Sequence, residues 1–247
     1  MPPPYEQPHY AKFAAIPFVP QGPAGPSPQQ WAIELELQGI PDATRLPSCP
    51  LDRAGVRAVC QNPERPLLHG YICAMAWGGQ EKSLRGPKRV TESWSQRAAI
   101  TQHLVTLRKG GLTRSDAYNL FEGQGKIKEL GPSFFTKLLF FFSPDDDCYI
   151  MDQWTAKSVN LLTGEIVVRA YDSSPTAENK GGNYQAYCEE VDALAALLNE
   201  TGDQIEQRLM SNGGRNPAPW RTHVKSHYPY NKNRLMARYP HIDPEDF

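Results

Sequence analysis

The most apolar part of the chain is a run of five residues, Leu138 to Phe142, at the end of the stretch PSFFTKLLFFF. A membrane-spanning helix needs roughly 20 apolar residues, so this shorter stretch predicts a helix buried in a protein core. A Gly131-Pro132 turn precedes it and a polar turn follows. Asp152 then stands where a second helix should begin, because aspartate is a preferred N-cap. Lys137 lies inside the apolar helix, where an unpaired ammonium group would be costly.

Elsewhere, hydrophobic residues recur mostly with the 3.6-residue period of helices, so the predicted fold class is mainly α. The stretch from Leu67 to Trp77 is apolar and breaks at Gly78-Gly79, and residues 80–90 are polar and predict a loop. A short strand is predicted at residues 166–170. The other predicted helices cover residues 51–60, 91–108, 113–121, 184–199 and 203–210.

Composition divides the chain into three parts. Residues 1–65 are rich in proline, which is unfavourable inside helices, and should form a mostly extended arm packed on the body. Residues 66–212 should form a helical domain with a hairpin at 126–143. Residues 213–247 form a C-terminal segment of basic and aromatic residues without clear periodicity. The apolar groups expected to hold the arm on the body are Phe13, Ile16, Phe18, Trp31 and Leu37.

Charge is unevenly distributed although the net charge is only −1. Residues 82–137 carry 11 Lys or Arg and 4 Asp or Glu, and residues 208–242 carry 7 Lys or Arg and no acid. Residues 178–206 between them hold 7 acids and one lysine. Two basic segments can form a face for a polyanion, or they can be ordinary solvated surface.

Cysteine and histidine spacing gives no sign of a metal site. The 5 cysteines are odd in number and widely spaced, without a CxxC pair. His223 and His227 are four residues apart, but no helix is evident there and no third ligand is near. No signal peptide or membrane segment is visible, so we expect a soluble, cytoplasmic protein with reduced thiols.

The chemistry of the central stretch has two interpretations. A glycine turn before a helix directs backbone N–H groups outward and can bind phosphate. Lys137 can be a nucleophile activated by desolvation, and Asp152 can deprotonate or hold a partner. Alternatively, Lys137 extends its ammonium group to solvent and Asp152 is only a helix N-cap.

Three motifs resemble a known family: AWGGQ at 76–80, GPSFFTK at 131–137 and IMDQWTAKSV at 150–159. The Gly-Pro hairpin helix followed by an Asp-led helix is similar to the helix-hairpin-helix DNA glycosylase superfamily. The resemblance is stronger to its 8-oxoguanine DNA glycosylase-like bacterial branch, and it runs from about Leu67 to Met210. It implies a two-lobed helical enzyme whose cleft receives a base flipped out of DNA.

Residue by residue, the resemblance implies that Asp152 stabilises the developing sugar cation or activates the nucleophile. The hairpin, at Leu130, Gly131 and Ser133, would hold a DNA phosphate through backbone amides. A monovalent cation can bind at such a hairpin, and no cofactor is expected to be required. Stacking would offset part of the cost of base flipping. Candidates for the base pocket are Trp77, Gln80, Phe134, Gln153, Trp154 and Tyr184.

One position departs from the family pattern. The lysine nucleophile of 8-oxoguanine glycosylases follows the hairpin glycine closely, and that position here is Ser133. Lys137 lies one helical turn later on the same face, from which it could reach the same cleft. Otherwise the enzyme has no Schiff-base nucleophile, Asp152 activates water, and the strand is not cut.

The expected function is therefore excision of a modified base from DNA, with AP-lyase activity if Lys137 is the nucleophile. It would serve base excision repair or defence against modified foreign DNA. The expected partner is duplex DNA, the expected state is a monomer, and the location is the nucleoid. One alternative is a non-catalytic protein that uses the hairpin as a phosphate clamp, and another is an enzyme acting on free nucleosides.

Overall fold

A computed structural model describes residues 5–79, 86–170, 174–212 and 216–228. These residues contain helices joined by loops and no strand, which confirms the mainly α fold class. The chain divides into two compact units. One comprises residues 21–148, and the other joins residues 1–20 to residues 149–247. In the described residues, no helix is both long and apolar enough to cross a membrane.

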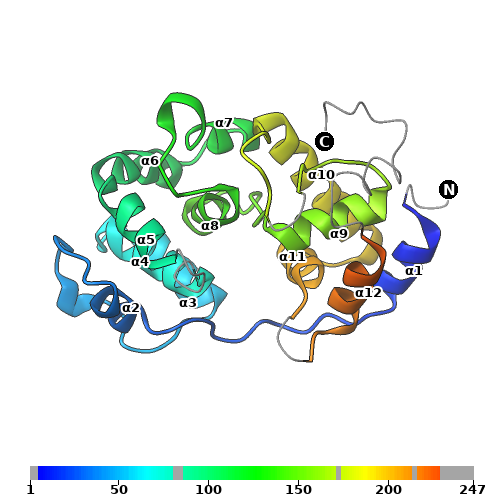
Figure 1. The fold of residues 1–247 in the computed structure, drawn as a ribbon, viewed down its shortest axis with the longest axis horizontal. Coiled ribbons are helices and arrows are strands. Elements are labelled where there is room, and N and C mark those ends of the chain that lie inside the picture. The colour runs from blue at the N-terminus through cyan, green and yellow to red at the C-terminus, as the bar shows by residue number, and fades with distance from the viewer. Residues whose placement is uncertain (1–4, 80–85, 171–173, 213–215, 229–247) are drawn as a thin grey trace. The chain divides into compact units, whose positions relative to one another are not determined.

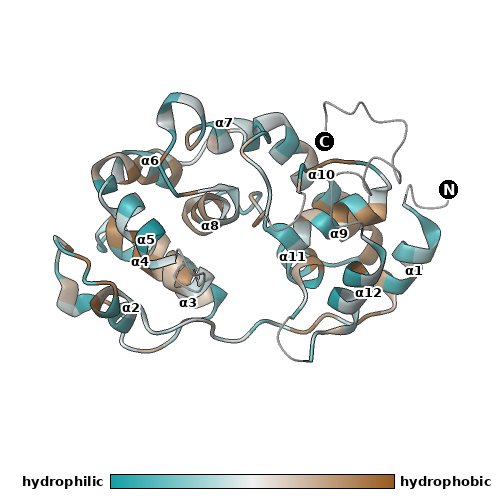
Figure 2. Cartoon of the chain, in the orientation of Figure 1, coloured by the Kyte–Doolittle hydropathy of each residue, from teal (hydrophilic) through white to brown (hydrophobic). Residues whose placement is uncertain are grey.

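The unit of residues 21–148 is built around α4 (Leu67–Gly78) and α8 (Pro132–Phe142), which pack against each other (Figure 1). Both are apolar around most of their circumference, as the predominantly brown and pale ribbon of α8 shows in Figure 2. From Phe135 to Phe142, every residue of α8 is buried. The other helices of this unit are α2 (Pro28–Glu34), η1 (Ala43–Arg45), α3 (Arg53–Gln61), α5 (Gly86–Trp94), α6 (Arg97–Lys109), α7 (Arg114–Asn119) and η3 (Gly123–Gly125).

The second unit has α9 (Gln153–Thr163) as its central helix, and four helices pack against it. Residues Thr155 to Leu162 of α9 are all buried, polar ones included. Ser158 illustrates how the polar ones are satisfied, because its hydroxyl donates to Leu209 O at 2.9 Å. The surrounding helices are α1 (Gln7–Ala14), α10 (Gly181–Leu198), α11 (Gly202–Met210) and α12 (Pro219–His227).

The helices predicted at 51–60, 113–121, 184–199 and 203–210 are confirmed as α3, α7, α10 and α11. Side chains cap the first turns of two of these helices. The Asp52 carboxylate accepts a hydrogen bond from Gly55 N at 2.7 Å at the start of α3. The Thr113 hydroxyl accepts from Asp116 N at 3.1 Å at the start of α7.

Four local predictions differ from the structure. The predicted loop at 80–90 gives way to α5 from Gly86 onward, and the predicted helix at 91–108 is divided between α5 and α6. The predicted strand at 166–170 is absent, because the Asn160 side chain bonds both the N–H of Val168, at 3.0 Å, and its carbonyl, at 2.7 Å. The C-terminal segment contains α12, which was not predicted.

The N-terminal segment is more helical than its prolines suggest. Helices α1 and α2 each have proline in the first turn, where the missing N–H costs nothing. Residues 1–20 belong to the unit of α9, on which α1 packs, and the Arg208 guanidinium donates to Phe13 O at 2.7 Å. Residues 21–65 belong to the other unit. The packing of residues 1–65 as one arm stays a prediction, as do the boundaries at 65 and 212.

Helices α1 and α12 meet at three histidines. His9 Nδ1 lies 3.0 Å from His223 Nε2, and the His223 and His227 rings stack with centroids 4.0 Å apart. Glu6 lies 3.3 Å from the other ring nitrogen of His9. Burial, together with the positive charges of His227, His9 and Lys12, lowers the pKa of His223 to about 4, and burial is the largest cause. His223 is therefore neutral in the folded protein near neutral pH.

This depressed pKa predicts acid destabilisation. Below the ordinary histidine pKa of 6.5, the unfolded chain binds a proton at His223 that the folded protein does not bind until about pH 4. The contribution of His223 to the free energy of unfolding is therefore fully present above pH 6.5 and is lost as the pH falls towards 4. Thermal melts from pH 7.5 to 4.5 should show a Tm decrease that is a few degrees smaller in His223→Gln. An equal decrease in both proteins would contradict this prediction.

Candidate active site

Asp152 is the N-cap of α9, as the sequence predicts. Its Oδ1 accepts hydrogen bonds from Trp154 N at 2.7 Å and Thr155 N at 3.0 Å, and the Thr155 hydroxyl accepts from Asp152 N at 2.9 Å. This reciprocal capping box fixes the carboxylate at the positive end of the helix dipole. No hydrogen bond or ion pair from a described residue reaches Oδ2, so one carboxylate oxygen remains available to a ligand.

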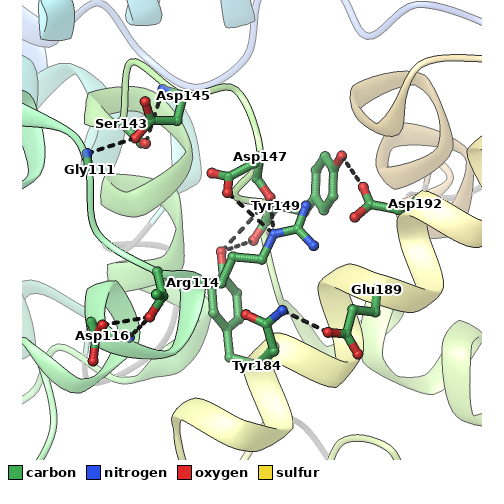
Figure 3. Close-up of polar contacts among 12 residues, drawn as sticks. Gly111, Arg114, Asp116, Ser143, Asp145, Asp147, Tyr149, Tyr184, Glu189 and Asp192 are labelled. Atoms are coloured by element: carbon green, nitrogen blue, oxygen red, sulfur yellow. Dashed lines mark hydrogen bonds and ion pairs between the residues drawn. The ribbon is translucent and has the colours of Figure 1, made fainter.

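The chain entering Asp152 is held by α10. The Tyr184 hydroxyl donates to Tyr149 O at 2.8 Å and accepts from Tyr149 N at 3.1 Å, as Figure 3 shows. The Tyr187 hydroxyl donates to Ile150 O at 2.7 Å. Burial raises the pKa of Tyr187, and the Glu206 charge raises it further, so the phenol remains a donor. These contacts give the aspartate a rigid support.

Tyr184 was predicted as a base-pocket candidate, and its surroundings bear on that role. The side chain is fully buried and its hydroxyl is engaged with the Tyr149 backbone. The Tyr149 hydroxyl in turn donates to Asp192 at 2.7 Å. Stacking of Tyr184 on a base stays a prediction, and it would require the ring to become exposed.

The turn between α8 and Asp152 is anchored within the unit of residues 21–148. Arg114 Nε donates to Asp147 O at 2.8 Å and lies 3.6 Å from the Asp147 carboxylate. Gly111 N donates to the Asp145 carboxylate at 3.1 Å (Figure 3). These contacts join the turn after α8 to the loop between α6 and α7 and to the first residue of α7.

Lys137 is buried in the second turn of α8, with only 6% of its surface exposed. Its Nζ donates to the carbonyl oxygen of Ser133 on the same helix and lies 5.1 Å from the centroid of the Phe134 ring. One interpretation of the sequence was that the Lys137 ammonium group extends to solvent. The structure differs, because this group is held against its own helix. A buried lysine amine is the kind of group that environment can tune for nucleophilic chemistry.

Gly78, at the end of α4, makes room for this lysine. A Cβ atom at Gly78 would lie 2.8 Å from both Cδ and Cε of Lys137. Gly78 lies within the helix, so its backbone conformation does not require glycine, in contrast to Gly79 with φ 65°. The absence of a side chain at Gly78 therefore determines where the lysine stem lies. From the sequence alone, the glycine pair predicts only a helix stop.

Replacing Gly78 by alanine should displace Lys137 and reduce any chemistry that depends on its amine. We expect Gly78→Ala to lower the yield of a borohydride-trapped protein–DNA adduct by at least about tenfold, since a misplacement of about 1 Å can cost 10²-fold. The control is Gly182→Ala, because Gly182 lies near the start of α10 with nothing within 4 Å of its Cβ position. Equal adduct yields in the two variants would contradict the positioning role of Gly78.

Ser133 Oγ and Trp77 Nε1 are among the buried polar atoms that have no hydrogen-bond partner in the described residues. The Trp77 ring is 5% exposed and packs edge-to-face on Phe141, with centroids 5.3 Å apart. Buried polar groups are normally bonded, so these two are candidates for contact with water or a ligand. Phe134, which follows Ser133 in the sequence, is half-buried.

The hairpin turn presents free backbone groups. Gly131 is exposed, and its carbonyl accepts from the N–H groups of Phe134 and Phe135. The N–H groups of Gly131 and Ser133 bond to no described residue. Leu130 is buried and its N–H donates to Ile127 O at 3.2 Å. Unbonded N–H groups at the start of an 11-residue helix suit an anion.

The remaining candidates lie at the start of α9 or outside the described residues. Gln153 and Trp154 are both half-buried, immediately after Asp152. Gln80 falls in residues 80–85, outside the part of the chain that the structure describes. Lys137 and Asp152 belong to different compact units. Within the described ranges, no group of three or more His, Cys, Asp or Glu is arranged to hold a metal ion.

A lysine in a Gly-Pro-led helix and an aspartate capping the next helix are both present, as the resemblance to DNA glycosylases predicts. Comparison with family models matches residues 19–210 to the family described as "Putative 8-oxoguanine DNA glycosylase OGG-like protein". This match covers most of the chain, and the protein belongs to this family. No curated protein and no solved structure matches this chain.

Proposed function

We propose that this protein excises a modified base from DNA after flipping the nucleotide out of the duplex, with Asp152 as the catalytic carboxylate. The supporting observation is the Asp152 side chain itself, with Oδ1 committed to two backbone N–H groups and Oδ2 left available. A fixed negative charge stabilises the positive charge that develops on the sugar as the glycosidic bond breaks. Membership of a DNA glycosylase family supports the same reaction class.

Lys137 is the proposed nucleophile. The lone pair of neutral Nζ forms a bond to C1′ of the sugar while the bond from C1′ to the base breaks. The base leaves with that electron pair and takes up a proton. Nζ then loses a proton. The bond from C1′ to the ring oxygen O4′ breaks, and O4′ keeps the electron pair and takes up a proton from Nζ. The product is an imine between Lys137 and C1′, which is the intermediate of AP-lyase strand cleavage.

Without the lysine step, Asp152 would direct hydrolysis of the glycosidic bond. A water molecule attacks C1′, Asp152 accepts its proton, and the base leaves with the electron pair of the broken bond and a proton. The products are a free base and an abasic site in an uncut strand. Burial of Lys137 supports the lysine route, because an amine held against Phe134 is partly desolvated.

DNA would be held at the hairpin by the N–H groups of Gly131 and Ser133, near which a monovalent cation can bind. Trp77, Phe134 and Trp154 are the proposed base-contacting rings, with Trp77 Nε1 and Ser133 Oγ as unbonded donors. The identity of the released base would distinguish a role in repair from a role in defence against modified foreign DNA. The expected substrate is duplex DNA, and the expected active form is a monomer.

The test compares binding with excision on one set of duplexes carrying different modified bases. After incubation, alkali cleaves the strand wherever a base has been lost, and a mobility-shift measurement reports binding to the same duplexes. We expect cleavage at one class of modified base. Binding to all duplexes with no alkali-sensitive site in any would identify a non-catalytic DNA-binding protein, and excision from free nucleosides without duplex binding would identify a nucleoside enzyme.

A further inference from the structure

Three cationic side chains surround the ring of Trp154, two residues after Asp152. The Arg221 guanidinium carbon lies 3.9 Å from the ring centroid, and Lys157 Nζ and Lys225 Nζ lie 5.4 and 5.7 Å from it. Lys157 comes from α9, and Arg221 and Lys225 come from α12. We call Trp154, Lys157, Arg221 and Lys225 the Trp154 cluster.

Arg221 fixes the cluster in place. Its Nε donates to Met210 O at 3.1 Å and its guanidinium donates to Ser211 O at 2.6 Å, at the C-terminal end of α11. Arginine near a helix C-terminus is favoured because it meets the carbonyls that have no partner within the helix. Arg221 is buried and thus joins α11, α12 and the Trp154 ring.

Lys225 is the member of the cluster that faces solvent. It is exposed, one helical turn after Arg221, and no described Asp or Glu lies within ion-pair distance of it. Residues 208–242 contain no acid at all, so no carboxylate from that segment competes for its charge. An exposed cation beside a partly exposed aromatic ring is the combination that binds nucleic acid, because the cation meets phosphate and the ring meets sugar or base.

Helix α12 also lies beyond residue 210, where the match to the family model ends. It packs directly on α9, the helix that Asp152 caps. We propose that α12 is a DNA-binding element added to the family domain, and that Lys225 contacts a backbone phosphate near the excised nucleotide. The proposal rests on the proposed function, since it places DNA at the start of α9.

The experiment measures binding of the full-length protein to an undamaged duplex at several salt concentrations. Loss of one phosphate contact should reduce the slope of log K against log salt by about 0.9. We expect this reduction, with several-fold weaker binding at low salt, in Lys225→Ala, and a larger loss in Lys225→Glu. Lys225→Arg should keep the wild-type slope, because it keeps the charge.

The matched control is Lys180→Ala, which removes an exposed lysine from the same compact unit at the start of α10. It should leave the slope unchanged. Equal slopes for wild type, Lys225→Ala and Lys225→Glu would overturn the proposal. Because the duplex is undamaged, the result does not depend on excision. Failure of the proposed function would appear separately, as a wild-type protein that binds but releases no base.

Discussion

Asp152→Asn should abolish most base release while leaving the protein folded. Asparagine is as good an N-cap as aspartate, and its side-chain oxygen can accept the same bonds from Trp154 N and Thr155 N. The substitution therefore removes the negative charge and little else. Loss of one preorganised electrostatic group costs about 10²–10³-fold in rate. We expect a loss of at least this size in the single-turnover rate of base release.

The matched control for this variant is Asp52→Asn. Asp52 caps α3 with a 2.7 Å bond from Gly55 N, so the chemical change is the same at another helix start. Both variants should melt within a few degrees of wild type, and only Asp152→Asn should lose activity. An active Asp152→Asn protein would reduce the aspartate to a helix cap, which is the simpler interpretation of its sequence position.

Lys137→Met should eliminate the covalent adduct trapped by borohydride. Methionine is unbranched and apolar, so it can fill the space against Gly78 without an amine. If Lys137 is the nucleophile, the reduced imine disappears completely, because no other group replaces Nζ in the bond to C1′. The measurement is denaturing electrophoresis of protein and labelled duplex after reduction.

Two further variants test which position in the sequence supplies the nucleophile. Lys109→Met removes an exposed lysine at the end of α6 and should still trap DNA. Ser133→Ala alters the position where the family pattern expects lysine, and it should also still trap DNA because serine has no amine. Base release by wild type without any adduct would assign catalysis to water activated by Asp152, and an adduct that persists in Lys137→Met would place the nucleophile elsewhere.

The features predicted correctly from sequence are mostly local. The Asp152 cap depends on Asp152 and Thr155, three residues apart, and the burial of α8 depends on its own run of phenylalanine and leucine. The sequence of helix α12 also carries a local signal, because Trp220, Val224 and Tyr228 recur every four residues, and all three are buried. That spacing is the helical period, and it could have found the helix.

The features that sequence reasoning missed are contacts between distant parts of the chain. The space that Gly78 leaves for Lys137 joins α4 to α8, and the histidine contact joins His9 to His223. The strand predicted at 166–170 failed for a related reason, since Asn160 satisfies the Val168 backbone. Such pairings depend on tertiary packing, which hydrophobic periodicity in one segment does not report.

The most direct test of the account is mass spectrometry of the free base released from modified duplexes, with 8-oxoguanine included, under an excess of enzyme. The account predicts one equivalent of free modified base per duplex from wild type, and almost none from Asp152→Asn at equal DNA occupancy. Bound, intact duplex with every modified base would contradict it, and so would equal release by the two proteins.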